Sequence, residues 1–415
     1  MSFLRLKPDA DALALPAEIA FLLPEGVPVA HLARAAALAR AAGTDAATAL
    51  LQAGLMGEEP YYRALARALG APFLDGAIPL GPGLRFPDSL VIGMAPLRTG
   101  GPAPCVMAPR GRQIAELLSG RSARGGPAIT TPTRLRAGVF AARAAEIAAY
   151  AADNLEHHAP AWAFGRGTAN RWLLFLGLVL TTLACLFLAL PPGAALAVTV
   201  LLQLFLLAMT GFRIAALFTP AEETAPPPPL PDHALPTYTV LVALYREAAV
   251  IDRIVPALAR LDYPAARLDL KLVIEADDAR TAAALARIPL PPRFELITVP
   301  PGLPRTKPRA LNVALPLARG SLLVVYDAED VPEPGQLRQA AALFAGSPAT
   351  TAALQGRLLV DNPEDSWLAR CFTLEYAGLF GVLNPALARW RMPMPLGGTS
   401  THFRGLMEQM HQKAA

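Results

Sequence analysis

Three acidic side chains follow an apolar run near residue 325 of this chain. The run Leu322 to Val325 predicts a buried strand, and Asp327, Glu329 and Asp330 come shortly after it. Carboxylates at the carboxyl end of a strand in an open α/β sheet lie where such sheets bind ligands. Their hard oxygen atoms suit Mg²⁺ or Mn²⁺ bridging a diphosphate. The alternative is an acidic turn that caps the next helix, and this group alone does not separate the two.

Three further polar groups stand near the ends of other predicted elements. They are Tyr245-Arg246-Glu247, Asp277-Asp278 and the run from Lys307 to Asn312. The first two groups follow predicted strands. The third opens a predicted helix, with Pro308 in the first turn, where its missing N–H costs little. A helix cap or a surface charge would explain any one group. The occurrence of all four groups in this order favours a common site.

Alternating strands and helices are expected to position these side chains. Strands are predicted over 238–244, 268–274, 294–299, 321–326 and 352–360, and helices over 247–261, 279–288, 308–317 and 335–345. This alternation is typical of a doubly wound parallel sheet. In such a sheet the carboxyl ends of the strands share one edge, which brings the polar groups together.

The composition indicates a membrane-associated protein. Of the 415 residues 53% are hydrophobic, and the 17% that are charged fall below the usual quarter. The formal net charge of +4 is modest, and no dense Lys/Arg stripe with interleaved aromatic residues appears, so we expect no nucleic-acid partner. The three cysteines are far apart in sequence and predict neither a disulfide framework nor a zinc site.

Two uncharged runs have the length of membrane-spanning helices. They cover 172–190 and 194–213 and are separated by Pro191-Pro192-Gly193. A hairpin in a soluble core is the alternative, but the combined length without an internal charge favours a transmembrane hairpin. Arg166 and Arg171 precede the hairpin and Arg213 ends it, while the turn has no charge. The positive-inside rule therefore places both flanks in the cytoplasm.

These patterns predict a chain of several parts. They are a small N-terminal α/β domain over 1–150, a connector over 151–171, the two transmembrane helices over 172–218, a Pro-rich linker over 219–235 and an α/β domain over 236–415. The clearest N-terminal helices are predicted over 31–42 and 61–69, short strands and turns over 71–80 and 89–96, and a loop over 100–109.

Residues 236–404 resemble the nucleotide-sugar-binding core of a family 2 glycosyltransferase with a GT-A fold. The layout is similar to that of membrane-attached synthases of cellulose and related β-glycans. The matching motifs are Leu244-Tyr245-Arg246-Glu247, Glu275-Ala276-Asp277-Asp278, Lys307-Pro308-Arg309-Ala310-Leu311-Asn312, Tyr326-Asp327-Ala328-Glu329-Asp330 and Pro395-Leu396-Gly397-Gly398-Thr399-Ser400. The resemblance implies inverting transfer of a sugar from a nucleotide-diphospho-sugar to a polysaccharide or lipid-linked acceptor. It also implies a multi-pass protein of the bacterial inner membrane with both soluble parts in the cytoplasm.

The resemblance also implies roles for the donor-side residues. Tyr245, Glu247 and Asp277 would contact the nucleobase and ribose, and Lys307 would approach the diphosphate. Asp327 would contact the donor as well, through the metal ion described next.

The metal motif and the acceptor region follow from the same resemblance. Asp327 and Glu329 occupy the outer positions of the family's D-x-D motif and would hold Mg²⁺ or Mn²⁺. Because Asp330 stands beside Glu329, the carboxylate that holds the ion is left open. Gly397, Gly398 and Thr399 would lie near the acceptor.

The C-terminal tail departs from the family pattern. After Gly-Gly-Thr-Ser, similar proteins continue into a Thr-Glu-Asp base motif and a Gln-x-x-Arg-Trp motif, and neither is present before Ala415. Glu408 is the only carboxylate in the tail, so no catalytic base is assigned. We therefore expect a truncated or frame-shifted member that binds donor and transfers sugar poorly or not at all. A methyl- or nucleotidyltransferase on a similar sheet is disfavoured, because the glycine-rich phosphate loop is missing.

The alternative to a transferase is a catalytically impaired membrane protein whose N-terminal domain binds a partner or cyclic di-GMP. The stretch Gly43 to Asp75 resembles the N-terminal domain of type II secretion ATPases, some relatives of which bind that nucleotide. Ala41-Ala42-Gly43 stands where their ligand motif would begin. A packing or protein-interaction domain is the other interpretation of this stretch.

An aromatic helix is also predicted near residue 372. Its residues Trp367, Arg370, Phe372, Tyr376 and Phe380 are compatible with sugar stacking. An amphipathic helix that packs on the sheet or lies at the membrane interface is the favoured interpretation.

Overall fold

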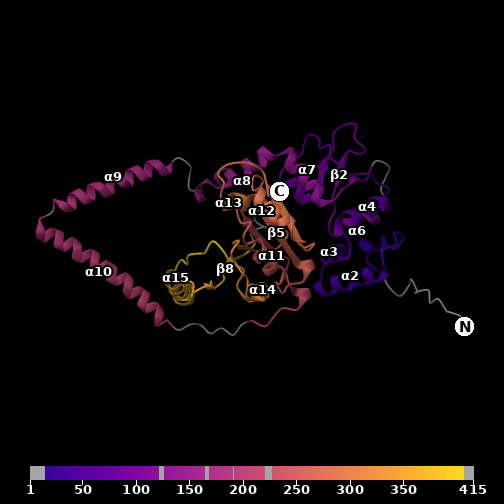
Figure 1. The fold of residues 1–415 in the computed structure, drawn as a ribbon. Helices are drawn as coiled ribbons and strands as arrows, with labels where there is room; N and C mark the ends of the chain where they lie inside the picture. Colours follow the sequence, from indigo (N-terminus) through magenta and orange to yellow (C-terminus); the bar gives the residue numbers. More distant parts are fainter. Residues whose placement is uncertain (1–14, 121–125, 164–167, 190, 220–226, 406–415) are drawn as a thin grey trace. The chain divides into compact units, whose positions relative to one another are not determined.

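The computed structural model describes residues 15–120, 126–163, 168–189, 191–219 and 227–405 (Figure 1). Arg166, residues 220–226 of the predicted linker and the tail with Glu408 lie outside the described residues. The chain divides into two compact units. The first comprises Met1–Ala152, Pro226–Leu354 and Gly398–Ala415, and the second comprises Asp153–Ala225 and Gln355–Gly397.

The N-terminal part of the first unit consists of helices around a small sheet. The helices are α1 (Ala17–Ala20), α2 (Val29–Ala42), α3 (Ala46–Gln52), α4 (Glu58–Leu69), α5 (Asp88–Ile92), α6 (Arg112–Ser119), α7 (Pro132–Ala142) and α8 (Ala144–His158), of which α8 continues past Ala152 into the second unit. The strands are β1 (Met94–Pro96), β2 (Cys105–Met107) and β3 (Ala128–Ile129), with β2 antiparallel to β1 and parallel to β3.

Strand β2 lies where the sequence predicts a loop. Its central residue Val106 is fully buried and is paired with Ala95 on one side and Ala128 on the other. Three residues flanked by glycine and proline are too few to give a periodic signal. Pairing with strands distant in sequence therefore determines this element. The predicted helices over 31–42 and 61–69 correspond to α2 and α4, each ended by a glycine in the left-handed conformation.

The larger sheet has six strands in the order β6-β5-β4-β7-β9-β8. Its strands are β4 (Tyr238–Leu244), β5 (Leu268–Glu275), β6 (Phe294–Val299), β7 (Leu322–Tyr326), β8 (Ala353–Gln355) and β9 (Thr401–Arg404). Strands β4 to β7 pair in parallel, and β9 pairs antiparallel to β7. The helices that follow these strands are α11 (Ile251–Ala259), α12 (Ala279–Ala286), α13 (Lys307–Ala314) and α14 (Gln336–Gly346). The sheet is thus mostly parallel, with an antiparallel strand inserted beside β7.

Burial explains why these strands form. Strand β4 is paired on both sides, and six of its seven residues are buried. Strands of a parallel sheet covered on both faces are near-continuous apolar runs, as this one is. The exceptions to that rule are Thr239, Asp269 and Lys271, which are polar and almost fully buried near the amino ends of β4 and β5.

The N-terminal segment shares a hydrophobic core with the sheet. Phe86, Ile147 and Ala151 belong to the same buried cluster as Leu241 of β4 and Val273 of β5. The Arg267 side chain donates from Nε to the carbonyl of Ala42 at 2.7 Å, and Asn312 donates to the carbonyl of Ala151 at 2.9 Å. Residues before 152 and the sheet are therefore one compact unit.

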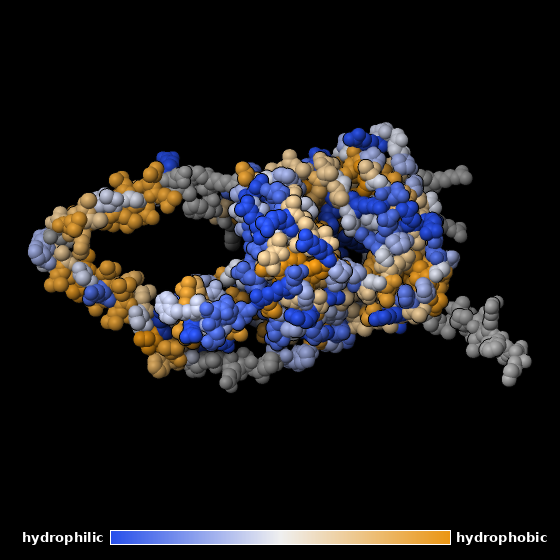
Figure 2. Space-filling model, in the orientation of Figure 1, coloured by the Kyte–Doolittle hydropathy of each residue, from blue (hydrophilic) through white to orange (hydrophobic). Residues whose placement is uncertain are grey.

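The second unit is helical and strongly apolar at its surface. It contains α9 (Thr168–Leu188), α10 (Pro192–Leu217), α15 (Trp367–Gly378), the π-helix η5 (Leu379–Leu383) and α16 (Asn384–Arg389). Figure 2 shows hydrophobic residues along α9 and α10. The segments Arg171–Leu188 and Pro192–Leu217 are long and apolar enough to cross a membrane, and neither is buried within the protein. Helix α15 has no buried residue, and Trp367 is 78% exposed.

Candidate functional site

A cavity of about 250 Å³ opens at the carboxyl ends of β4, β5 and β7. Its charged and polar lining includes Tyr245, Glu247, Glu275, Arg305, Lys307, Asp327 and Glu329. The parallel strands bring these residues to one edge of the sheet, as the sequence predicts. Of the predicted donor-side residues, Asp277 does not line the cavity. It is held beside it, because the Arg305 guanidinium binds the Asp277 carboxylate at 2.7 Å.

The turn after β7 separates the roles of its three carboxylates. The Asp330 carboxylate accepts the backbone N–H of Asp327 at 2.7 Å and also accepts the hydroxyl of Thr399. Burial raises the pKa of Asp330 above its ordinary value, and the hydrogen bond from Thr399 opposes that rise. Asp330 therefore shapes the turn, whereas the side chains of Asp327 and Glu329 line the cavity.

Lys307 is the cation nearest to this turn. Its ammonium group forms an ion pair with the Asp327 carboxylate and donates to the carbonyl of Gly398 at 3.0 Å. Both charged side chains keep about a third of their surface exposed. The residue begins α13, so its position is fixed by the helix that Thr306 and Pro308 start. An incoming anion and a divalent cation can each replace one partner of this exposed pair.

The turn after β4 has an unusual backbone conformation at Arg246. Its φ is +62°, a left-handed value that non-glycine residues seldom adopt. Its N–H donates to the Asp278 carboxylate, which also accepts the Thr281 N–H at 3.1 Å and caps α12. Burial disfavours the charged form of Asp278, but these hydrogen bonds outweigh it and the pKa is lowered. Asp278 thus fixes the turn that presents Tyr245.

Two residues of the cavity, Glu275 and Arg305, were not predicted from the sequence as site residues. Glu275 ends β5 and lines the cavity, where Arg309 donates from Nη1 to both carboxylate oxygens at 3.0 and 3.1 Å. The side chains of Arg309 and Glu275 are 1% and 6% exposed. Arg305 follows the turn before α13 and lines the same cavity. The only sequence signal was their position at the edges of the polar motifs.

The carboxylates at the cavity fit a divalent cation whose remaining ligands are water and substrate phosphates. Among the described residues no group of three or more His, Cys, Asp or Glu side chains is arranged to hold a metal ion. Mg²⁺ commonly uses one or two protein carboxylates, with water and substrate phosphates as further ligands. Asp327 and Glu329 supply such a pair of hard oxygen donors. These carboxylate oxygens are therefore compatible with Mg²⁺ or Mn²⁺ as the bound ion.

The predicted acceptor region is divided between the two units. Gly398 and Thr399 belong to the first unit, where β9 places them beside β7, and Thr399 also accepts the N–H of Asp327 at 3.1 Å. Gly397 belongs to the second unit, where its N–H donates to Gln355 at 2.7 Å. Glu408, the only carboxylate of the tail, lies outside the part of the chain that the structure describes.

Comparison with known proteins gives one family model and two curated relatives that match part of this chain. The family model for glycosyltransferase like family 2 matches residues 236–412. "Probable glycosyltransferase YdaM" of Bacillus subtilis (strain 168) is 32% identical over 101 residues, which are 24% of this chain and 24% of that protein. "Beta-monoglucosyldiacylglycerol synthase" of Synechocystis sp. is 34% identical over 128 residues, which are 31% of this chain and 26% of that protein. The chain thus spans about a quarter of each of these relatives.

Among the solved structures that are similar, one matches about half of this chain. It is a mannosyltransferase from Pyrobaculum calidifontis in complex with GDP-Man and Mn²⁺, with 24% sequence identity and a TM-score of 0.38. The match covers 52% of this chain and 57% of that one. The family match and the mostly parallel sheet agree with the GT-A-like α/β fold expected from the motifs. Residues 236–412 of this chain thus match the model of glycosyltransferase like family 2, and the described part of this range holds the larger sheet and the cavity at its strand ends.

Proposed function

We propose that this protein transfers a sugar from a nucleotide-diphospho-sugar to a lipid-linked or polysaccharide acceptor, with a divalent cation and with inversion at the sugar. The observation that carries the proposal is the cavity at the strand ends, where Lys307 stands beside Asp327 and Glu329. These groups lie in the part of the chain that matches the family. A diphosphate leaving group develops negative charge, which a fixed ammonium group and a cation both stabilise.

The protein side chains divide the work of donor binding. Tyr245, Glu247 and Asp277 are proposed to contact the nucleobase and ribose, with Arg305 holding Asp277 in place. Lys307 would leave Asp327 for the diphosphate, and Asp327 with Glu329 would hold Mg²⁺ or Mn²⁺. When bound, that ion would supply charge neutralisation at the diphosphate. The structure suits this exchange because the Lys307–Asp327 pair is partly exposed and hence costs little to separate.

The acceptor is proposed to approach from the side of Gly398 and Thr399. Both residues adjoin Lys307 and Asp327 through backbone and hydroxyl hydrogen bonds. One relative is named for a glucosylated diacylglycerol, which favours a lipid acceptor over a soluble one. We assign no general base to the described residues.

We further propose that α9 and α10 span a bacterial inner membrane, with both flanks in the cytoplasm. The two helices expose Leu, Phe and Val side chains along their length (Figure 2). Helix α15 would lie at the membrane interface, since Trp367, Leu368 and Leu374 are more than half exposed and it buries no residue. Membrane vesicles washed with alkaline carbonate test this: the protein should stay in the pellet, and release into the supernatant would contradict it.

Cyclic di-GMP binding by the N-terminal segment is the alternative function. No described contact favours it, and Ala41-Ala42-Gly43 ends α2 where the resembling ligand motif would begin. Calorimetric titration of the full chain with cyclic di-GMP, with the donor nucleotides as a parallel series, decides between the two functions. Heat from cyclic di-GMP together with no binding of UDP or GDP would favour the alternative.

Titration with UDP and GDP, with and without Mn²⁺, tests the donor site directly. We expect metal-dependent binding of one nucleotide, reduced at least about tenfold by Asp327→Ala, because a lost metal ligand removes several kcal/mol of charge stabilisation. Asp252→Ala is the matched control, since Asp252 is an exposed carboxylate on α11 that does not line the cavity. Equal affinities for all three proteins, or binding that ignores Mn²⁺, would refute the assignment.

A further inference from the structure

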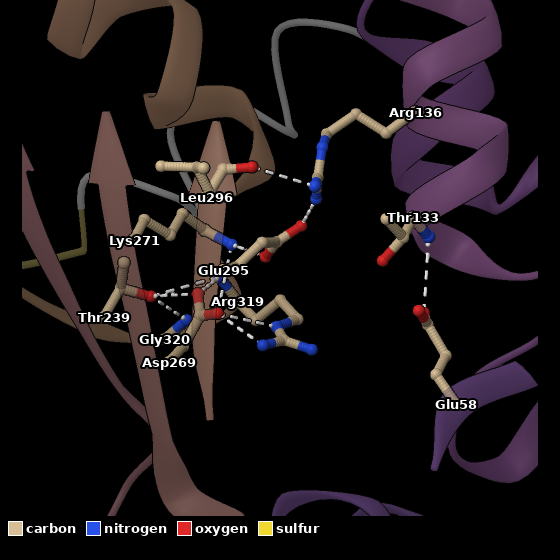
Figure 3. A network of polar contacts seen from close by, with 10 residues as sticks. All are labelled: Glu58, Thr133, Arg136, Thr239, Asp269, Lys271, Glu295, Leu296, Arg319 and Gly320. Carbon is tan, nitrogen blue, oxygen red and sulfur yellow. Dashed lines mark hydrogen bonds and ion pairs between the residues drawn. The ribbon is translucent and has the colours of Figure 1, made fainter. Parts of the chain in front are cut away.

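A network of charged side chains, centred on the buried Asp269 and Lys271, lies between α7 and the amino ends of the sheet strands (Figure 3). Lys271 is fully buried, and its ammonium group binds Asp269 at 3.0 Å and Glu295 at 2.5 Å. The Arg319 side chain also binds Asp269, with Nε at 3.0 Å. Arg136 of α7 forms an ion pair with Glu295 and donates to the carbonyl of Leu296 at 3.0 Å. The N-terminal segment is therefore joined to the sheet by charge.

This network borders two adjoining cavities of about 590 and 600 Å³. Arg110, Pro132, Arg136, Glu295 and Arg319 line both of them. The cavities lie at the amino ends of the strands, because Glu295 is the second residue of β6 and Arg319 precedes β7. The donor cavity lies at the opposite, carboxyl ends, where Glu275 ends β5. A ligand in this space would not occupy the donor site.

The lining of the two cavities carries an excess of positive charge. Five arginines face it, Arg110, Arg112, Arg136, Arg293 and Arg319, against three glutamates, Glu58, Glu116 and Glu295. The Arg110 guanidinium makes no hydrogen bond or ion pair with a residue that the structure describes. Arg110 is exposed to solvent, and the neighbouring Arg319 repels its charge. An anion bound between these guanidinium groups would offset their mutual repulsion.

We propose that the space shared by the two adjoining cavities binds a phosphate-bearing anion, with Arg110 as its main contact and Arg319 and Arg136 beside it. A guanidinium group is planar and presents paired N–H donors that match phosphate oxygens. The apolar side chains of Leu90, Ile92 and Leu317 on the wall of one cavity would contact the organic part of a phosphate ester. The bound anion would hold the N-terminal segment against the sheet, because its ligands come from both.

The test is calorimetric titration of the full chain in detergent with inorganic pyrophosphate, in EDTA so that the donor site lacks its cation. We expect binding at one site, weakened at least about tenfold by Arg110→Gln, which corresponds to ~1.4 kcal/mol. Arg110 is chosen because it holds no ion pair among the described residues, so that its loss does not unpair a buried carboxylate. Arg34→Gln, an exposed arginine of α2, is the matched control and should leave the affinity unchanged.

Asp327→Asn separates this site from the donor site. Binding that survives Asp327→Asn and is lost in Arg110→Gln supports the proposal, whether or not the donor site is active. Binding lost in Asp327→Asn but kept in Arg110→Gln would place the anion in the donor cavity and overturn it, as would no binding at all. Titration with adenosine 5′-monophosphate and with inorganic phosphate distinguishes a phosphate ester from a free phosphate ion as the natural ligand. Tighter binding of adenosine 5′-monophosphate indicates that the organic part contacts the apolar wall. Equal affinities indicate that the site binds the free phosphate ion.

Discussion

Acidification is expected to loosen strand β9 through a single buried histidine. His402 is 2% exposed, and its Nδ1 is hydrogen-bonded to the hydroxyl of Tyr238 at 2.5 Å. Burial lowers the pKa of His402 from 6.5 to about 4. Below pH 6.5 His402 is therefore protonated in the unfolded chain but stays neutral in the folded chain until the pH nears 4. The free energy of unfolding consequently falls as the pH falls.

The size of this effect follows from the shift. Each pH unit between the unfolded and folded pKa removes ~1.4 kcal/mol. At pH 5 the loss is about 2 kcal/mol, and near pH 4 it approaches its limit of about 3 kcal/mol. Because β9 places Thr399 beside the turn of Asp327, the same acidification should loosen one wall of the donor site.

Hydrogen exchange of peptides that cover Thr401–Arg404 measures the local stability of β9. A local measurement is needed because a chain of two compact units need not unfold in one step. His402→Gln keeps an acceptor for Tyr238 but does not titrate. We expect the wild-type chain to lose about 2 kcal/mol more protection than the variant between pH 7 and pH 5, after correction for intrinsic exchange. His31→Gln, at an exposed position of α2, is the control. Equal losses in wild type and His402→Gln would refute the reasoning.

Three further predictions concern the groups around the donor cavity. Arg309→Met leaves the Glu275 carboxylate buried without its cation. It should lower the free energy of unfolding by about 3–5 kcal/mol in denaturant titrations. Adding Glu275→Gln to the same chain should restore most of that loss. Asp278→Ala removes the cap of α12 and the acceptor for the Arg246 N–H, and should cost about 1–2 kcal/mol in the same assay and weaken nucleotide binding. Thr399→Val removes the hydroxyl that Asp330 accepts and should lower Mn²⁺-dependent nucleotide affinity several-fold, with an unchanged circular dichroism spectrum; unaltered affinity would contradict this role.

The strands of the larger sheet were the most predictable elements. The predicted strands over 238–244 and 294–299 coincide with β4 and β6. Strand β4 is covered on both faces and is a near-continuous apolar run, whereas β6 is an edge strand with mixed burial. The helix predicted from residue 247 begins later, at Ile251. The residues before it form the turn that holds Arg246 in the left-handed conformation, a requirement of the Asp278 hydrogen bond that no local pattern encodes.

The charged network under α7 was the least predictable feature. Asp269 and Lys271 stand in the strand predicted over 268–274, where two charges in an apolar run were a signal that the sequence analysis passed over. Their partner Glu295 is on β6, and Arg136 comes from the N-terminal segment, 160 positions before the carbonyl of Leu296 to which it donates. Such partners are brought together only by the fold.

The sequence by itself determined the four parallel strands of the sheet and the chemical types of side chain at its carboxyl edge, because apolar runs and polar strand ends are local patterns. It did not predict β9, and the strand predicted over 352–360 is limited to β8, Ala353–Gln355. Only the tertiary structure decided which carboxylates face the cavity. The Asp330 carboxylate does not line the cavity and instead accepts the hydroxyl of Thr399, a residue 69 positions away. The structure likewise decided that the N-terminal segment shares a core with the sheet and encloses a second, arginine-lined cavity. These outcomes depend on contacts between residues distant in sequence, whose geometry exists only once the chain has packed.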